Sequence, residues 1–434
     1  MFLSSSSAKF NVEDEALHPM TRPRSLTRFG IILIVIFTLA SGSFLFSASP
    51  AGKKVVHKRR AVKGKAPIKS SGMTKIAVRR ATVAQTAIAN QAIAAKIAAS
   101  KRAATRGTWR VPNYADSLEG DNVDGEDLLV RRAAVDALGP LNGSIVVTDA
   151  NTGRILTMVN QKLALRNGFQ PCSTVKVPIA LAALSENVVD RETLFQLTRR
   201  RSIAMTEAIA HSNNQYFANL GRKLGFERVS YYARMFGLGE KAGLDIEGEQ
   251  AGILPVTEPK SGVGMMTSFG DGISLTPLEY AALIGAVANG GTLYYLQYPR
   301  TDQDAQSLVP RIKRRLDIDN LVTEIKPGMM GAVEYGTARR VGFDPNIPIY
   351  GKTGTCTDSR SPTHLGWFGS FVDSGKGKYV VVVLLTGGRL VSGPAASGVA
   401  GNVYKALNAS NFYNREPQGI SPNALITAIG TGSN

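Results

Sequence analysis

The sequence is poor in the residues that build metal centres and disulfide frameworks. Its 434 residues include 2 cysteines, 4 histidines and 2 tryptophans, which excludes a small disulfide-stapled domain. The histidines do not recur at the spacing of metal ligands, so we expect no metal and no other cofactor: His18, His57, His211 and His364. With 44% hydrophobic residues the chain can still bury a large core, in up to about three folded units.

Acidic residues are absent from one long segment. Residues 51–110 hold 16 Lys and Arg and no Asp or Glu, whereas the whole chain has a net charge of +18. The remaining residues therefore carry a net charge of only +2. A strongly basic balance can indicate nucleic-acid binding, but here the excess belongs to one low-complexity arm. We therefore expect no nucleic-acid partner.

One stretch near the N-terminus is uncharged and apolar over the length that crosses a membrane. Residues 29–48 (FGIILIVIFTLASGSFLFSA) are 20 residues long, the length that a helix needs to span the hydrocarbon. We interpret them as a transmembrane anchor that follows a cytoplasmic tail, residues 1–28. A cleavable signal peptide with its apolar run at 31–40 is the alternative. Basic residues flank both ends, so the positive-inside rule does not settle the orientation.

Residues 49–127 are expected to form a linker that is first basic and alanine-rich and then acidic. The alanine-rich part favours helix but has a thin apolar stripe, so we expect a solvated, partly helical spacer. The alternative is electrostatic contact with anionic lipid headgroups or wall polymers. Six acidic residues mark the predicted end of the linker: Asp116, Glu119, Asp121, Asp124, Glu126 and Asp127.

Residue patterns after the linker predict a mixed α/β (α+β) domain over residues 128–413, followed by a flexible C-terminal tail, 414–434. The spacing in LLVRRAAVDALG predicts a helix, and GSIVVTDANTGRILTMVN predicts a hairpin. Residues 172–235 are mostly helical by pattern, and residues 347–387 return to strands. Strands are predicted at both ends of the domain sequence, with helices between them. This order indicates a sheet that is formed by segments distant in the sequence and is covered by helices.

Ser173 and Lys176 form the first candidate motif, SxxK, at the predicted start of a helix. Residues three apart lie on one helix face, so the lysine amine can approach the hydroxyl. A serine needs a neighbouring base to act as a nucleophile, and a lysine desolvated near other cations can be neutral enough to serve. The motif alone is weak, because Ser6 and Lys9 match it as well.

Two further motifs follow along the chain. Ser212 and Asn214 form SxN inside a predicted helical stretch, where the hydroxyl can relay a proton and the amide can hold a substrate carbonyl. Residues 352–355 (KTGT) lie on a predicted strand edge. A cation and two hydroxyls there can fix a carboxylate, and the glycine lets a substrate backbone lie close.

With SxxK, SxN and KTG in this order, the chain resembles the penicillin-recognising serine transpeptidase family over residues 128–410. Other stretches are also similar to that family: NGSIVVTDANTGRILTMV, GLDIEGEQAGILP, GDGISLTPLEYAALIGAVANGGT, VEYGTARR and WFGSFV. The resemblance implies a β-lactamase/transpeptidase-like fold, in which helices flank an antiparallel sheet of about five strands.

The resemblance also implies a role for each motif residue. Ser173 would be the acylated nucleophile, and Lys176 the base that activates it. Ser212 would pass a proton to the leaving amine, and Asn214 would hold the amide of the stem peptide. Lys352 would set the electrostatic field around Ser212.

The remaining residues of the third motif would bind the donor substrate. Thr353 and Thr355, with Gly354 between them, would bind its terminal carboxylate, and the backbone N–H groups of Ser173 and Thr355 would form the oxyanion hole. The implied reaction is D,D-transpeptidation, in which a D-Ala-D-Ala stem peptide of peptidoglycan acylates the serine and an amine of a second stem resolves the acyl-enzyme. β-Lactam antibiotics would bind the same site, and the catalytic domain would lie on the periplasmic side of a bacterial cytoplasmic membrane.

Three alternatives stay open. A D,D-carboxypeptidase or a serine β-lactamase would use water as the acceptor, and a sensor would bind β-lactams or muropeptides without catalysis. Glu247 and Glu249 lie at a plausible position for the deacylating glutamate of a β-lactamase. No asparagine follows at the right spacing, so we expect slow hydrolysis of the acyl-enzyme.

The two cysteines depart from the family pattern. Cys172 stands where a glycine normally precedes the nucleophile, and Cys356 lies just past KTGT. If the motifs converge on one cleft, both thiols lie beside it, and an oxidising compartment would let them form a disulfide. Some carbapenem-hydrolysing β-lactamases carry cysteines at the matching places. Two buried free thiols, or metal or redox chemistry, are the alternatives.

Overall fold

The structure is a computed structural model that describes residues 111–358 and 362–415. The predicted anchor at 29–48, the basic part of the linker and nearly all of the predicted C-terminal tail lie outside these residues. Within the two described ranges, no helix combines the length and the apolar character that a membrane crossing requires.

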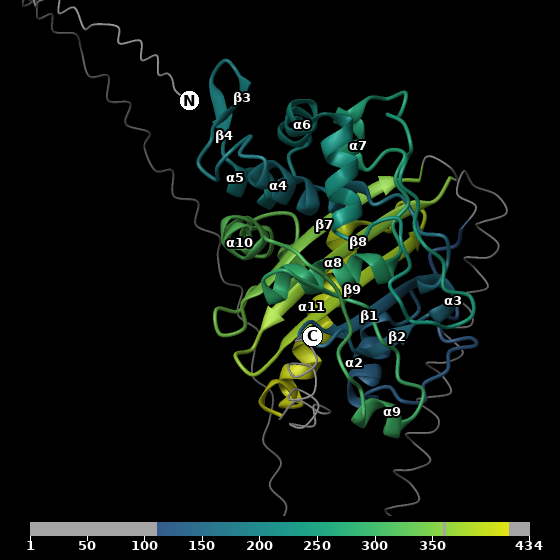
Figure 1. Cartoon of the computed structure of the whole chain (residues 1–434). Coiled ribbons are helices and arrows are strands. Elements are labelled where there is room, and N and C mark those ends of the chain that lie inside the picture. Colours follow the sequence, from purple (N-terminus) through teal and green to yellow (C-terminus); the bar gives the residue numbers. More distant parts are fainter. Residues whose placement is uncertain (1–110, 359–361, 416–434) are drawn as a thin grey trace, which may run out of the picture. The chain divides into compact units, whose positions relative to one another are not determined.

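Five strands form one antiparallel sheet, in the order β2-β1-β9-β8-β7 (Figure 1). The strands are β1 (Gly143–Asp149), β2 (Ile155–Val159), β7 (Ile349–Thr357), β8 (His364–Asp373) and β9 (Lys378–Gly387). Strands β1 and β2 form the predicted hairpin, and β7 to β9 are the predicted C-terminal strands. Because β9 pairs with β1, the expectation that distant segments complete the sheet is confirmed.

Strand β9 is the centre of the sheet, and its sequence KYVVVVLLTG explains this position. Alternate side chains of a strand point to opposite faces, so a continuous apolar run suits a strand covered on both sides. Val380, Val382 and Leu384 join the core on one face of the sheet. Val381, Val383 and Leu385 join a second core on the other face.

Helices cover both faces. The first core contains α4 (Lys176–Ser185), α6 (Asn214–Met235), α7 (Val263–Phe269) and α8 (Pro277–Asn289). The second core contains α2 (Leu128–Leu138) and α11 (Gly393–Ala409). Helix α10 (Asp319–Glu334) packs along β7 and contributes to both cores, so it closes that side of the sheet.

Short elements connect these layers. The helical ones are α3 (Gln161–Ala164), η1 (Cys172–Val175), α5 (Met205–Ala210), α9 (Asp302–Gln306), η2 (Arg339–Val341) and η3 (Phe412–Asn414). Two small two-stranded sheets are formed by the hairpin of β3 (Phe195–Thr198) with β4 (Arg201–Ile203) and by β5 (Thr292–Tyr294) with β6 (Ile312–Arg315). The first hairpin interrupts the region that the pattern predicted to be mostly helical.

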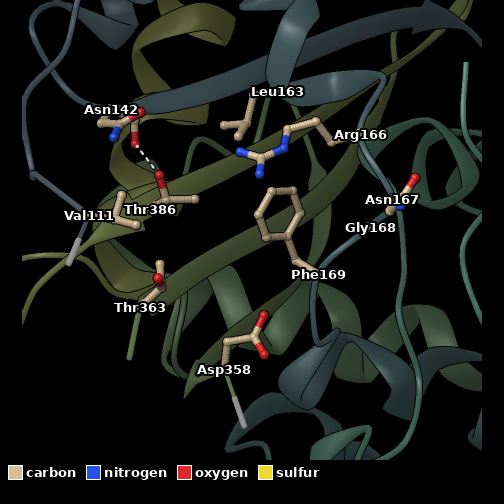
Figure 2. Close-up of a pocket in the computed structure, with 10 residues that line it drawn as sticks. All are labelled: Val111, Asn142, Leu163, Arg166, Asn167, Gly168, Phe169, Asp358, Thr363 and Thr386. Atoms are coloured by element: carbon tan, nitrogen blue, oxygen red, sulfur yellow. Dashed lines mark hydrogen bonds between the residues drawn. The ribbon is translucent and has the colours of Figure 1, made fainter. Parts of the chain in front are cut away.

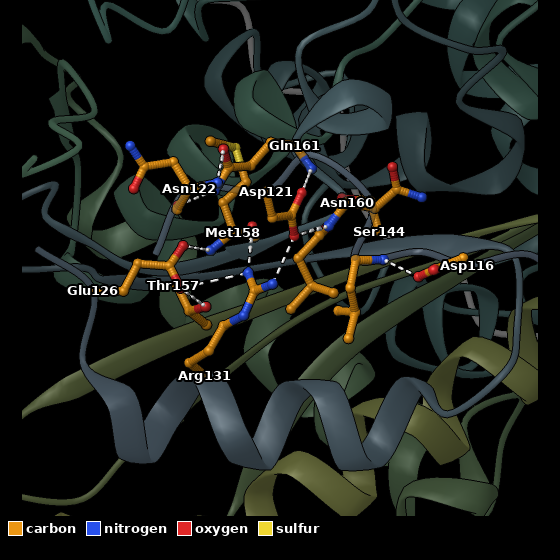
Figure 3. A network of polar contacts seen from close by, with 12 residues as sticks. Asp116, Asp121, Asn122, Glu126, Arg131, Ser144, Thr157, Met158, Asn160 and Gln161 are labelled. Atoms are coloured by element: carbon orange, nitrogen blue, oxygen red, sulfur yellow. Dashed lines mark hydrogen bonds and ion pairs between the residues drawn. The ribbon is translucent and has the colours of Figure 1, made fainter. Parts of the chain in front are cut away.

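The acidic segment 116–127, which the sequence places at the end of the linker, packs against β2 and α2 (Figure 3). Glu126 is buried and accepts hydrogen bonds from the Thr157 hydroxyl (2.6 Å), the Met158 N–H (2.9 Å) and the Tyr298 hydroxyl (2.8 Å). The Arg131 guanidinium lies 2.7 Å from Asp121 and 3.5 Å from Glu126. Buried carboxylates persist when they are paired and hydrogen-bonded, so this segment is fastened to β2 and α2.

Candidate active site

The first motif lies where η1 runs into α4. Ser173 is nearly buried, and Lys176 at the start of α4 is fully buried. The Thr174 hydroxyl donates to the Pro171 carbonyl (2.7 Å), which fixes the turn that carries the serine. Nζ of Lys176 lies 3.0 Å from Oγ of Ser173, so the two side chains share one face as their spacing predicted.

The second motif lies in a loop, and the prediction of one helical stretch through it was wrong. Helix α5 ends at Ala210 and α6 begins at Asn214. Between them Ser212 adopts a left-handed backbone (φ 54°), and the Asn213 side chain caps α6 by accepting from the Tyr216 N–H (2.8 Å). A local side-chain cap competes with helix continuation, which explains the break.

Lys176 joins the first motif to the second. Its Nζ lies 2.8 Å from the Ser212 carbonyl oxygen, 3.1 Å from Ser212 Oγ and 2.5 Å from Asn214 Oδ1. The same amine therefore contacts the hydroxyls of Ser173 and Ser212 and the amide of Asn214. This arrangement places a proton acceptor between two hydroxyl groups.

Lys352 on β7 joins the third motif to the second. Its Nζ lies 2.8 Å from Ser212 Oγ and donates to the Thr353 carbonyl (2.9 Å), and its side chain is fully buried. Both lysine amines thus lie within hydrogen-bond distance of the Ser212 hydroxyl. The three motifs, which are far apart in the sequence, meet around one hydroxyl group.

Two ammonium groups cannot both stay charged at such close range without solvent. Burial, and secondarily the charge of Lys352, lower the pKa of Lys176 to about 6. Burial lowers the pKa of Lys352 to about 7. Both pKa values are lowered, which favours loss of a proton from this pair near neutral pH, and Lys176, 3.0 Å from Ser173 Oγ, is placed to accept the serine proton.

The family assignment follows from comparison with known proteins. The family model of the penicillin binding protein transpeptidase domain matches residues 143–409. This chain belongs to that family. Stage V sporulation protein D of Bacillus subtilis is 28% identical over 281 residues, which are 57% of this chain and 43% of the relative. Peptidoglycan D,D-transpeptidase FtsI of Escherichia coli is 26% identical over 333 residues, 66% of this chain and 53% of the relative.

The chain spans about half the length of these curated relatives. Among solved structures, PBP2 of Pseudomonas aeruginosa is 24% identical and has a TM-score of 0.55, over 69% of this chain and 80% of its own. The D,D-transpeptidase domain of a peptidoglycan glycosyltransferase from Eggerthella lenta is 19% identical with a TM-score of 0.53, over 65% and 82%. At this identity both structures show a shared fold.

Within this transpeptidase domain, the KTGT threonines contact neighbouring elements. The Thr353 hydroxyl lies 2.6 Å from the hydroxyl of Thr337, and the Thr355 hydroxyl accepts from the N–H of Gly393 at the start of α11 (2.7 Å). Two hydroxyls that share one hydrogen bond leave one O–H free to donate to a ligand. Sequence reasoning missed Thr337 and Gly393, although the stretch VEYGTARR that contains Thr337 was part of the resemblance.

Gly354 allows β7 to lie directly against the nucleophile turn. A Cβ at this position would lie 2.9 Å from the Pro171 carbonyl oxygen and 3.0 Å from Cγ2 of Thr174. On the other side of the contact, the indole N–H of Trp367 donates to the Gln170 carbonyl (3.0 Å). Trp367 and its neighbour on β8 belong to the buried cores of the sheet, as the sequence predicted for Trp367 and Phe368.

Cys172 and Cys356 form a disulfide across the same contact, with 5.6 Å between their Cα atoms. Cys172 is buried and has a left-handed backbone (φ 54°), the conformation that the glycine usual in the family adopts without strain. The bond connects the residue before Ser173 to the residue after Thr355. It therefore fastens the nucleophile turn to the KTGT strand.

The two glutamates considered for a β-lactamase reaction differ in their surroundings. Glu249 is buried, and its carboxylate accepts hydrogen bonds from the N–H groups of Gly243 (2.9 Å) and Leu244 (3.0 Å). This carboxylate holds the turn that contains it. The Glu247 side chain is exposed.

Within residues 111–358 and 362–415, no group of three or more His, Cys, Asp or Glu residues could hold a metal ion. A cavity of about 390 Å³ lies at the end of the sheet where β9 ends and β8 begins (Figure 2). Arg166, Phe169, Asp358 and Thr386 are among its lining residues, and none of the three motifs contributes a lining residue.

Proposed function

We propose that this protein is a membrane-anchored D,D-transpeptidase that cross-links peptidoglycan. The observation that carries the proposal is the meeting of two buried lysine amines on Ser212 Oγ, 3.1 and 2.8 Å away, with Ser173 beside one of them. A neutral Lys176 and a cationic Lys352 give a base for the nucleophile and a positive charge for the substrate carboxylate. A general base and an electrostatic stabiliser are groups that assist acyl transfer from a D-Ala-D-Ala stem.

In the proposed acylation, Lys176 takes the proton of Ser173 as Oγ attacks the penultimate D-Ala carbonyl. The N–H groups of Ser173 and Thr355 stabilise the oxyanion. Ser212, between the two lysines, passes a proton to the leaving amine of the terminal D-Ala. The donor is held through its amide by Asn214.

Thr353 and Thr355, beside Gly354, hold the terminal carboxylate of the donor together with Lys352. The Thr337 hydroxyl, 2.6 Å from that of Thr353, orients it for this contact. β-Lactam antibiotics acylate the same serine.

The fate of the acyl-enzyme separates the transpeptidase from the β-lactamase. In the commonest class of serine β-lactamase, a glutamate positions and activates the water that hydrolyses the acyl-enzyme rapidly. Both oxygens of the Glu249 carboxylate are occupied by backbone N–H groups. This supports slow hydrolysis and transfer to an amine of a second stem peptide.

The anchor and the domain limits are also part of the proposal. Residues 29–48 would cross the cytoplasmic membrane, and residues 49–110 would be the spacer, in contact with anionic lipid or wall polymers through its basic residues. The packing of the acidic segment supports a catalytic domain that begins before residue 128. A periplasmic reporter fused after residue 110 tests this layout, because it would be active only if that point lies outside the cytoplasm.

Labelling of the purified full chain with a fluorescent penicillin tests the function. Ser173→Ala should abolish a stable label, because it removes the acylated oxygen. Ser6→Ala is a matched control, since Ser6 also begins an SxxK sequence and should leave the label unchanged. Rapid turnover of nitrocefin would indicate a β-lactamase instead, and a protein that never becomes labelled would indicate a non-catalytic domain.

A further inference from the structure

The acceptor amine must reach the acyl-enzyme beside Ser212. This step rests on the proposed function. The group that protonates the leaving amine in acylation also removes a proton from the incoming amine in the reverse sense, so both amines occupy the same side of the site. The side chains at the rim next to Ser212 are therefore those that the acceptor contacts.

His211 and Tyr335 form this rim. His211 directly precedes Ser212, and its ring lies 5.7 Å from the ring of Tyr335 at the end of α10. Both side chains remain partly open, with 45% of His211 and 43% of Tyr335 exposed. The N–H of Thr337 donates to the Ala210 carbonyl (3.1 Å), and the Thr337 hydroxyl contacts that of Thr353. The segment that follows Tyr335 therefore contacts both the residues before the SxN loop and the KTGT strand.

Glycines on and after α10 fix the position of these rings. A Cβ on Gly328 would lie 2.7 Å from Cβ of Ile209, and one on Gly336 would lie 2.2 Å from the Ala210 carbonyl oxygen. Helix α5 can therefore pack directly on α10. The Tyr335 hydroxyl lies over Gly331, where a Cβ would approach it to 2.5 Å. This close packing of α5 on α10 brings the rings of His211 and Tyr335 side by side.

A carboxylate lies against the same pair. Oε1 of Glu207 lies 3.4 Å from Nε2 of His211, one turn earlier on α5, and 3.8 Å from Nη2 of Arg201. A carboxylate beside aromatic faces attracts an ammonium group through charge and through the ring quadrupole. We propose that Glu207, His211 and Tyr335 form the subsite for the side-chain amine of the acceptor stem peptide.

The acceptor ammonium, held in the subsite, loses one proton to water, and the resulting amine attacks the ester carbonyl on Ser173. A new C–N amide bond forms and the ester C–O bond breaks. The second proton of the amine passes through the Ser212 hydroxyl to Oγ of Ser173.

The test measures how the acyl-enzyme divides between amine and water. The full chain is acylated with a D-alanyl thiolester donor, and Nα-acetyl-lysine methylamide is the amine probe. We expect Glu207→Gln and Tyr335→Leu each to lower the ratio of aminolysis to hydrolysis about threefold, and the double variant about tenfold. Tyr335→Phe, which keeps the aromatic face, should retain the ratio.

Two matched variants control for surface effects. Glu192→Gln removes an exposed carboxylate that also pairs with an arginine, and Tyr231→Leu removes an exposed tyrosine on α6. Neither should change the ratio. The melting temperature of each variant shows whether it is folded.

Two results would overturn the subsite. The first is that the double variant is still acylated and has the same ratio of aminolysis to hydrolysis as the unmodified protein. The other is an equal loss in the control variants. If the unmodified chain is not acylated by penicillin or by the thiolester, the proposed function itself fails, and the subsite fails with it.

Discussion

Removal of the Cys172–Cys356 disulfide should destabilise the domain by a calculable amount. The bond closes a loop with a sequence separation of 184 residues. The loop-entropy relation gives about 5 kcal/mol of stabilisation for a loop of this length. In the variant Cys172→Gly/Cys356→Ser, glycine relieves the left-handed backbone at position 172 and returns about 1 kcal/mol. The expected net loss in free energy of unfolding is therefore about 4 kcal/mol.

Thermal unfolding followed by circular dichroism measures this loss. For a domain of this size each kcal/mol shifts the midpoint by about 2–4 °C, so the midpoint should fall by about 8–16 °C. Cys172→Ser/Cys356→Ser should fall by a few degrees more, because serine keeps the strain that glycine removes. Penicillin acylation at low temperature, where the variant is folded, should also slow, since the bond joins the nucleophile turn to the KTGT strand.

The comparison with reductant provides the decisive control. Each protein is unfolded, reduced with dithiothreitol and refolded before its thermal midpoint is measured. This treatment should lower the midpoint of the unmodified protein and leave the midpoint of the double variant unchanged. A midpoint in the double variant within about 2 °C of the unmodified protein would refute the reasoning, because a loop of this length must contribute more.

Three further predictions concern the site and its support. The second-order rate of penicillin acylation should rise with pH through about 6, as Lys176 becomes the neutral base, and fall above about 7, as Lys352 loses the charge that binds the carboxylate. Gly354→Ala should lower the acylation rate at least about tenfold and the stability by about 1–3 kcal/mol, because its Cβ would overlap the nucleophile turn. Glu126→Gln should cost about 3 kcal/mol in urea unfolding, because it breaks a buried ion pair.

Each of these has a control or a contradicting outcome. An acylation rate that keeps rising to pH 10 would show that Lys176 is not the base with a lowered pKa. Gly285→Ala should be tolerated, because the nearest atom to its Cβ would be 3.9 Å away. Glu119→Gln should change stability by less than about 0.5 kcal/mol, since Glu119 is exposed and lies 4.0 Å from its partner Lys162.

The sequence predicted the sheet well because its strands leave strong local signals. The run KYVVVVLLTG has the composition of a central strand, and the turn formers at residues 151–153 locate the β1–β2 hairpin. The motifs were found through their order along the chain. Their convergence on Ser212 Oγ depends on contacts between residues up to 140 positions apart, which spacing alone does not encode.

Other parts could not be predicted for physical reasons. The acidic run at 116–127 has the pattern of a solvated boundary, and only its three-dimensional partners Arg131 and Tyr298 make it part of the interior. The break before α6 depends on the Asn213 cap and on the left-handed Ser212, in a stretch whose propensity favours one helix. Thr337 has no local signal, because its role comes from contact with Thr353 on another element.

The order of the strands has a consequence for how the protein is made. Strand β9 ends at residue 387 and fills the gap between β1 and β8. A nascent chain on the ribosome therefore exposes two unfinished sheet edges until nearly the whole domain has been synthesised, and pairings over such distances form slowly. Stop codons anywhere upstream of β9 should yield chains without a trace of acyl-enzyme, however many of the motif residues they still contain.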